Sequence, residues 1–358
     1  MSVNNLIERA LKESNRSNYL VAFNLYKDAL SLIDAEKDKS TLLTTLMSIA
    51  DTGRMTGNFV DSSTYYNQAI MLSRSQDNLE MTADAKIGLG LSQRALGYWK
   101  EALREFSDAR DYYEDNGDTE GLAFCVWATA GAFRIKGDIP KTLKTFNEAH
   151  KMFRELDDPC GAAYCLCGLG GASRAIGQYK ESLKYYQKAN AQFTSISDRF
   201  GVAYSYCGIG NANRMIGKYD TAMEYLKKAM TVYEKIGDIV SSAYTLWSIG
   251  VIYLIDKKYS YSERYFIRAL DYFKKTGDVR GEVYVGLGRS QVEFMKNNNN
   301  SAMDILMLAE KTAGDFSFSL EHCHALRIGE IIKDKERVSC YKLLGVKELG
   351  RTLPLNIP

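Results

Sequence analysis

The chain has 358 residues, and its 46 Lys and Arg side chains nearly balance 44 Asp and Glu, for a formal net charge of +2. This balance argues against a uniformly basic, nucleic-acid-coating protein. No apolar run approaches the ~20 residues that a membrane-spanning helix needs. The opening MSVNNLIERALKESNR lacks the apolar core of a secretory signal, and the seven cysteines fit reduced thiols. We therefore expect a soluble, cytoplasmic protein with no membrane-inserted segment.

The predicted elements are helical along the whole chain. Residues 1–38 are expected to form a partial repeat that caps the N-terminal end. Seven units of about 40 residues follow over 39–316, each with two antiparallel helices. A divergent pair of helices over 317–350 is expected to cap the other end, since terminal repeats must cover an exposed apolar face. For the tail, RTLPLNIP at 351–358, fraying and docking both stay open.

The repeat is visible as columns of similar residues at a spacing of about 40. The columns include Ala29, Ala69, Ala109, Ala149, Ala189, Ala229, Ala269 and Ala309; Gly57, Gly97, Gly137, Gly177 and Gly217; and Asp38, Asn78, Asp118, Asp158, Asp198, Asp238 and Asp278. The Asp or Asn predicts the N-cap of the first helix of each unit, and the glycine predicts its left-handed end. In the third complete unit these helices are expected at about 119–136 and 140–156.

A small–aromatic–small pattern accompanies the period. In LGLSQRALGYWKEALREFSDA, the residues Gly90, Ala102, Phe106 and Ala109 have the spacing of the tetratricopeptide repeat, which the chain resembles over nearly its whole length. The longer period is more similar to the subfamily of Pins-type G-protein regulators, kinesin light chains and bacterial signal-sensing repeat domains. The resemblance implies an all-α, right-handed α-solenoid of antiparallel helix pairs, whose first helices line a concave groove.

One face of these first helices carries the candidate site. Residues at i, i+3, i+7 and i+10 share a helix face, and the resemblance assigns this face to the groove. The candidate partner-binding residues are Phe124, Trp127, Tyr164, Cys167, Tyr204, Cys207, Asn211, Tyr244 and Trp247, with an arginine row of Arg54, Arg94, Arg134, Arg174 and Arg214. The arginine row ends at Leu254 and Phe294, which take its position in the last two units.

The arginine row has two interpretations. In the structural one, each arginine pairs with helix carbonyls or with an acidic residue of the adjacent unit, such as Glu101 or Glu181. In the functional one, the guanidinium groups face the groove and bind carboxylates by bidentate hydrogen bonds that lysine could not reproduce. The functional interpretation is favoured because the row stops while the repeat continues. The tyrosines of the same face are equally open to packing and to binding.

These features predict a non-enzymatic scaffold or adaptor that binds a linear, acidic or amphipathic segment of a protein partner in the groove. The alternative is a sensor in which a ligand or peptide tightens the superhelix, with Cys167 and Cys207 framing a pocket. An RNA-binding solenoid is less favoured because Asp51 and Asp84 lie on the same face. The partner's identity and the oligomeric state are not predicted.

Catalytic, metal and cofactor sites are not expected. The chain has three histidines, too few to assemble a nucleophile–histidine pair with any of the candidate residues. His322, Cys323 and His324 are adjacent in sequence, but positions i and i+2 of a helix point to different faces, which disfavours a shared metal ion.

Overall fold

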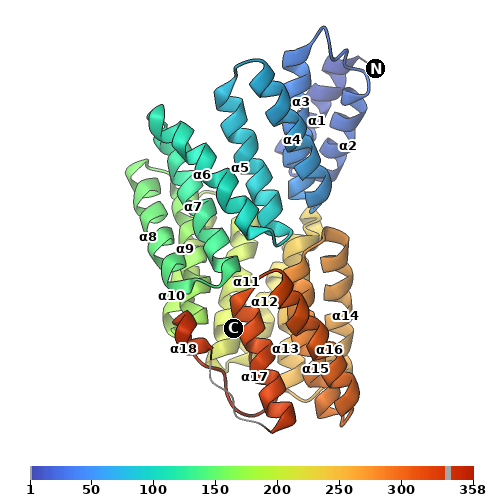
Figure 1. Cartoon of the computed structure of the whole chain (residues 1–358), viewed down its shortest axis with the longest axis vertical. Coiled ribbons are helices and arrows are strands. Elements are labelled where there is room, and N and C mark those ends of the chain that lie inside the picture. Colours follow the sequence, from blue (N-terminus) through green and yellow to red (C-terminus); the bar gives the residue numbers. More distant parts are fainter. Residues whose placement is uncertain (1, 335–339) are drawn as a thin grey trace.

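The computed structural model describes residues 2–334 and 340–358, all of whose regular elements are helices (Figure 1). The helices are α1 (Val3–Asn15), α2 (Tyr19–Leu30), α3 (Lys39–Met55), α4 (Phe59–Ser75), α5 (Leu79–Ala95), α6 (Trp99–Asp115), α7 (Thr119–Lys136), α8 (Ile139–Glu155), α9 (Pro159–Ala175), α10 (Tyr179–Ser195), α11 (Arg199–Ile216), α12 (Tyr219–Ile236), α13 (Ile239–Ile255), α14 (Tyr259–Thr276), α15 (Val279–Met295), α16 (Asn299–Asp315), α17 (Ser319–Lys333) and α18 (Tyr341–Leu344). The predicted all-α solenoid of paired helices is confirmed. No helix in the described ranges is both long and apolar enough to cross a membrane.

Local capping explains where the helices begin and end. The Asp118 carboxylate accepts a hydrogen bond from the Gly121 amide at 2.9 Å, which starts α7, and Gly137 ends it with φ 89°. The bounds of α7 equal the predicted ones. Where the glycine column lapses, Lys257 and Asn297 adopt the same left-handed conformation, with φ 57° and 65°.

The core between paired helices is made by the small and aromatic columns. Ala102 and Ala109 are fully buried, and Phe106 of α6 is 1% exposed. Phe106 lies so close to α5 that a Cβ at Gly90 would stand 2.5 Å from its ring. The small residue is therefore what lets the aromatic ring fill the space between the two helices.

The superhelix winds tightly enough for repeats that are far apart in the sequence to touch. The Trp99 indole at the start of α6 donates a hydrogen bond to the Phe316 carbonyl, 217 residues further on, at 3.1 Å. The carbonyl of Ala175, at the end of α9, accepts one from the Lys347 amide at 3.2 Å. The turns of the early repeats thus pack against the C-terminal repeats.

The C-terminal capping region differs from a full helix pair. After α17, residues 335–339 of the predicted cap lie outside the described residues, and α18 has only four residues. Cys323 and Cys340 form a disulfide that links α17 to the start of α18, with a Cα–Cα distance of 5.9 Å. The expectation of reduced thiols is therefore wrong for these two cysteines, because the fold brings them together. The tail docks: Leu355 and Ile357 are buried.

Candidate functional site

The predicted face lines a hollow in the N-terminal half of the solenoid. Met47 of α3, Ile87 of α5 and Phe124 of α7 border a space of ≈ 660 Å³ together with Arg54. The acidic residues of its lining are Asp51, Glu80, Asp84, Asp118, Glu120 and Asp158. Arg54 is the one basic residue of this lining, so the hollow has a negative potential. We call it the acidic hollow.

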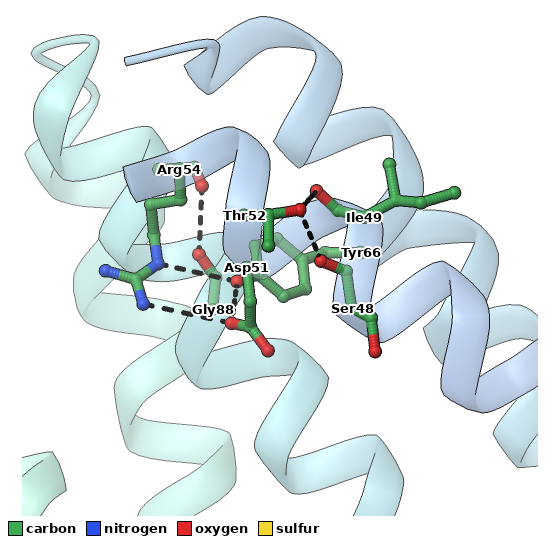
Figure 2. Close-up of polar contacts among 8 residues, drawn as sticks. Ser48, Ile49, Asp51, Thr52, Arg54, Tyr66 and Gly88 are labelled. Atoms are coloured by element: carbon green, nitrogen blue, oxygen red, sulfur yellow. Dashed lines mark hydrogen bonds and ion pairs between the residues drawn. The ribbon is translucent and has the colours of Figure 1, made fainter. Parts of the chain in front are cut away.

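Arg54 belongs to a cluster that ties α3 to α4 (Figure 2). Its Nε donates to the Tyr66 hydroxyl at 3.4 Å, and its Nη2 lies 3.8 Å from Asp51 Oδ1. The Tyr66 hydroxyl in turn donates to Asp51 at 2.5 Å, and Tyr66 is fully buried. Burial, opposed by the Arg54 charge, raises the Tyr66 pKa. The first arginine of the row is thus already paired within its own unit.

Arg94 and Arg214 each lie over a tryptophan of the following unit. The Arg94 guanidinium is 5.3 Å from the centre of Trp127, and that of Arg214 is 5.4 Å from the centre of Trp247. Arg94 Nη1 also donates to the Ala128 carbonyl at 3.2 Å. Burial, reinforced by the Arg134 charge, lowers the Arg94 pKa to about 10. Neither arginine forms an ion pair with a carboxylate of the described residues.

Arg134 and Arg174, in the middle of the row, lack such neighbours. Both Nε atoms are buried and have no hydrogen-bond partner in the part of the chain that the structure describes. In the units that follow Arg134 and Arg174, Cys167 and Cys207 stand at the repeat position where a tryptophan follows Arg94 and Arg214.

The carboxylates suggested by the structural interpretation are engaged elsewhere. Glu101 pairs with Arg104 at 3.3 Å, and Glu181 pairs with Lys184 at 3.2 Å. The centre of the inner surface therefore carries two guanidinium charges that no described carboxylate neutralises.

Like the arginines, the tyrosines of the face differ in whether the described part of the chain supplies them with a hydrogen-bond partner. Tyr164 donates to Asp198 at 3.0 Å and Tyr244 donates to Asp278 at 2.7 Å, so each bonds the N-cap aspartate of the next unit. Burial and the nearby carboxylate raise the pKa of both hydroxyls. Tyr204 stacks on Phe200 with ring centres 6.0 Å apart, and within the described ranges its hydroxyl has no hydrogen bond. Phe124 is 38% exposed.

The C-terminal part of the face is covered. Trp247 is buried, and its indole donates to the Tyr284 carbonyl at 2.9 Å; Cys167, at the centre of the face, is buried in a separate apolar cluster. Burial raises the pKa of the Cys207 thiol, beside which the Asn211 amide donates to the Cys207 carbonyl at 3.1 Å.

The cover is the C-terminal segment, residues 351–358, which lies against Arg214 and Gln291. Sequence reasoning did not include Gln291 or Asn356 in the site. The alternation of Leu353, Leu355 and Ile357 was the available signal for an extended, half-buried segment.

Comparisons with known proteins agree with this architecture. Residues 160–235 match the tetratricopeptide repeat family. No curated protein matches the sequence.

Solved structures with a similar fold cover most of the chain. A Rap protein complexed with competence and sporulation factor is 14% identical with a TM-score of 0.59, over 93% of this chain and 98% of that one. The Rap conjugation gene regulator of the plasmid pLS20, in complex with the Phr* peptide, is 11% identical with a TM-score of 0.67, over 88% and 95%. A signal transduction ATPase with a tetratricopeptide repeat sensor from Pyrococcus horikoshii is 16% identical with a TM-score of 0.52, over 94% and 50%. At these identities the likeness concerns the fold. The family match covers residues 160–235, and the repeat columns and helix pairs continue the same helix-pair architecture through the other units.

Proposed function

We propose that this chain is a non-enzymatic regulatory scaffold that binds a linear segment of a protein partner along its inner surface. The observation that carries the proposal is the pair Arg134 and Arg174, whose buried Nε atoms have no partner in the described chain. A guanidinium in a partly desolvated site gains most from a carboxylate, which it can bind in a bidentate way. The similar Rap regulator in complex with the Phr* peptide supports a peptide as the ligand.

The charges of the inner surface favour a segment that carries both basic and acidic residues over a purely acidic one. The acidic hollow, with Asp84 and Asp118 in its lining, would repel a carboxylate and attract a basic side chain. Arg134 and Arg174 would attract the opposite charge. A segment with a basic residue at the acidic hollow and an acidic residue at these arginines satisfies both. Phe124, in the lining of the acidic hollow, and Tyr204 both supply aromatic contact area.

A second candidate is a sensor, in which the bound segment changes the shape of the solenoid. The contact between Trp99 and the Phe316 carbonyl joins distant repeats, so a ligand held between the same repeats would bias how tightly they close. Ligand-dependent compaction, measured by small-angle X-ray scattering, separates this sensor from a scaffold of fixed shape.

The test is a peptide selection on the full chain, followed by affinity measurements on variants. Linear peptides would be selected by display, and their binding to wild type compared with Arg134→Ala/Arg174→Ala. We expect the double substitution to weaken binding by about tenfold or more, as truncation of an interface arginine commonly does. The melting temperature should stay close to that of wild type, because no described partner is lost.

Arg104→Ala/Arg110→Ala is the matched control, since both of these arginines form exposed ion pairs on α6. Its affinity should equal that of wild type. Undiminished binding by the Arg134/Arg174 double variant, or a large fall in its stability, would refute the proposal and favour a structural row.

A further inference from the structure

The C-terminal segment fills the inner surface as a bound peptide would. Leu355 and Ile357 are 3% and 1% exposed. They join the same apolar cluster as Trp247 of α13 and Leu287 of α15. The C-terminal end accordingly lies among the helices of the C-terminal half in Figure 1. This apolar contact is made by an extended segment and not by a further helix.

Polar contacts fix the register of this segment. The Leu355 amide donates to Gln291 Oε1 at 2.6 Å. The Asn356 side chain accepts a hydrogen bond from Arg214 Nη1 and donates one to the Arg214 carbonyl, the latter at 3.0 Å. Arg214 Nη2 donates to the Ile357 carbonyl at 2.9 Å. Side chains of the solenoid thus bind the backbone of the segment. Both the oxygen and the nitrogen of the Asn356 side-chain amide are hydrogen-bonded to Arg214.

The charge of Arg214 is not neutralised by this arrangement. Arg214 is fully buried, and its acceptors are the neutral oxygens of Asn211, Asn356 and Ile357. Burial, followed by repulsion from Arg174, lowers the Arg214 pKa to about 9. A buried cation is best stabilised by an anionic partner in good hydrogen-bonding geometry. A carboxylate in the place of the Asn356 amide would provide that partner.

We propose that the surface around Arg214 and Gln291 is a peptide subsite that residues 353–357 occupy in cis. An extended partner segment with a carboxylate at the Asn356 position, flanked by apolar residues, displaces them. The inference deepens the proposed function, on which it rests for the idea of a partner segment. Arg214 is available to the partner only after the C-terminal segment has left, so this segment competes with the partner for the subsite.

The experiment uses the chain's own segment as the probe. Two labelled peptides are needed: residues 351–358, and the same peptide with Asn356→Asp. Each is titrated into the full chain and into Leu355→Ser/Ile357→Ser, which releases the segment by making both of its buried apolar side chains polar. Leu343→Ser, at an 87% exposed position of α18, is the matched control.

We expect the released variant to bind the native peptide about tenfold or more tightly than wild type, which keeps its subsite filled, and Leu343→Ser to behave as wild type. The Asn356→Asp peptide should bind more tightly than the native one by a similar factor. Adding Gln291→Ala to the released variant should weaken both peptides. Failure of the released variant to bind either peptide, or a preference for the native one, would overturn the proposal.

Hydrogen exchange on wild type keeps the proposal testable if the released variant unfolds. In a displaceable segment, the Leu355 amide hydrogen should exchange through a local opening, and so faster than the amide hydrogens in the middle of α13. Its exchange should be faster still when the Asn356→Asp peptide is added. Exchange of Leu355 only through global unfolding, unchanged by the peptide, would make the segment a fixed part of the core. Neither measurement involves Arg134 or Arg174, so the proposed function and this inference can fail separately.

Discussion

Asn356 and Arg214 contact each other across 142 residues of chain, through hydrogen bonds in both directions between the Asn356 amide and the Arg214 guanidinium and carbonyl groups. The last arginine of the row is therefore held by the chain itself, as Arg54 is held by Asp51 and Tyr66. Within the described residues, Arg54, Arg94 and Arg214 thus have partners in the chain, whereas the Nε atoms of Arg134 and Arg174 have none. This division is what directs the proposed binding to Arg134 and Arg174.

The buried ion pair between Arg280 and Glu321 should dominate the stability of the last repeats. Arg280 Nη2 lies 2.5 Å from Glu321 Oε1, and Glu321 has no exposed surface. Arg280→Met would leave the carboxylate buried without its cation, which typically costs about 3–5 kcal/mol. We expect a loss of that order in the free energy of unfolding, measured with urea.

The double variant Arg280→Met/Glu321→Met provides the control for this pair. Because it removes both charges, it should be more stable than Arg280→Met alone. A double variant that is less stable than the single one would contradict this account, and would indicate that the contacts of Glu321 with other groups outweigh the ion pair.

Glycine in the middle of the first helices should be required by close packing. At Gly90 of α5 a Cβ would stand 2.5 Å from the Phe106 ring, whereas at Gly329 of α17 the nearest atom would be 3.5 Å away. We expect Gly90→Ala to destabilise the chain by about 1–3 kcal/mol, as overpacked cores do. Gly329→Ala should be neutral or stabilising by up to about 1 kcal/mol, since alanine is the better helix former. Equal effects of the two substitutions in thermal unfolding would rule out packing as the reason for the glycine column.

The fold was predictable because the signals that set it are local and repeated. The Asp118 cap involves an amide three residues away, and the Gly137 turn depends on a single residue. The docking of the C-terminal segment was not predictable, because the residues that receive Leu355 and Asn356 lie in α15 and α11. Short apolar segments carry no information about which distant groove they fill.

The candidate site was predictable in part, because the helical spacing that defines its face is also a local signal. The face could be derived from helical spacing, but the five arginines of one column have different environments. Part of that difference was present in the sequence, since Trp127 and Trp247 follow Arg94 and Arg214 where Cys167 and Cys207 follow the other two. The acidic hollow does not follow from the cap pattern, because Asp118 and Asp158 cap their helices and also line the inner surface.

The disulfide between Cys323 and Cys340 should stabilise the C-terminal region. It closes a loop with a sequence separation of 17, for which the entropy of loop closure corresponds to about 3 kcal/mol. We expect Cys340→Ser to lower the free energy of unfolding by up to that amount. Adding a reductant should lower wild type to the level of the variant and leave the variant unchanged. A wild type whose stability is insensitive to reductant would show that the disulfide makes no net contribution.

The stability of the chain should fall between pH 6.5 and pH 4 because His324 is buried. His324 of α17 is 1% exposed, and its Nδ1 lies 2.9 Å from the Tyr341 hydroxyl. Burial, against the opposing attraction of Glu321, lowers the His324 pKa from 6.5 to about 4. The unfolded chain therefore binds a proton between these two pH values and the folded chain does not. The stabilisation is fully present above pH 6.5 and is lost as the pH falls toward 4, by about 1.4 kcal/mol per pH unit.

Urea unfolding of wild type and His324→Gln at pH 7, 6 and 5 measures this loss. Glutamine can still bond to Tyr341 but does not titrate, so the variant should show a shallower decline, and the difference between the two chains isolates His324. His322→Gln, on the same helix, is the matched control for the effect of the substitution itself. Parallel curves for wild type and His324→Gln would mean that His324 takes up its proton in the folded chain, and that its burial contributes nothing to the acid sensitivity of the C-terminal repeats.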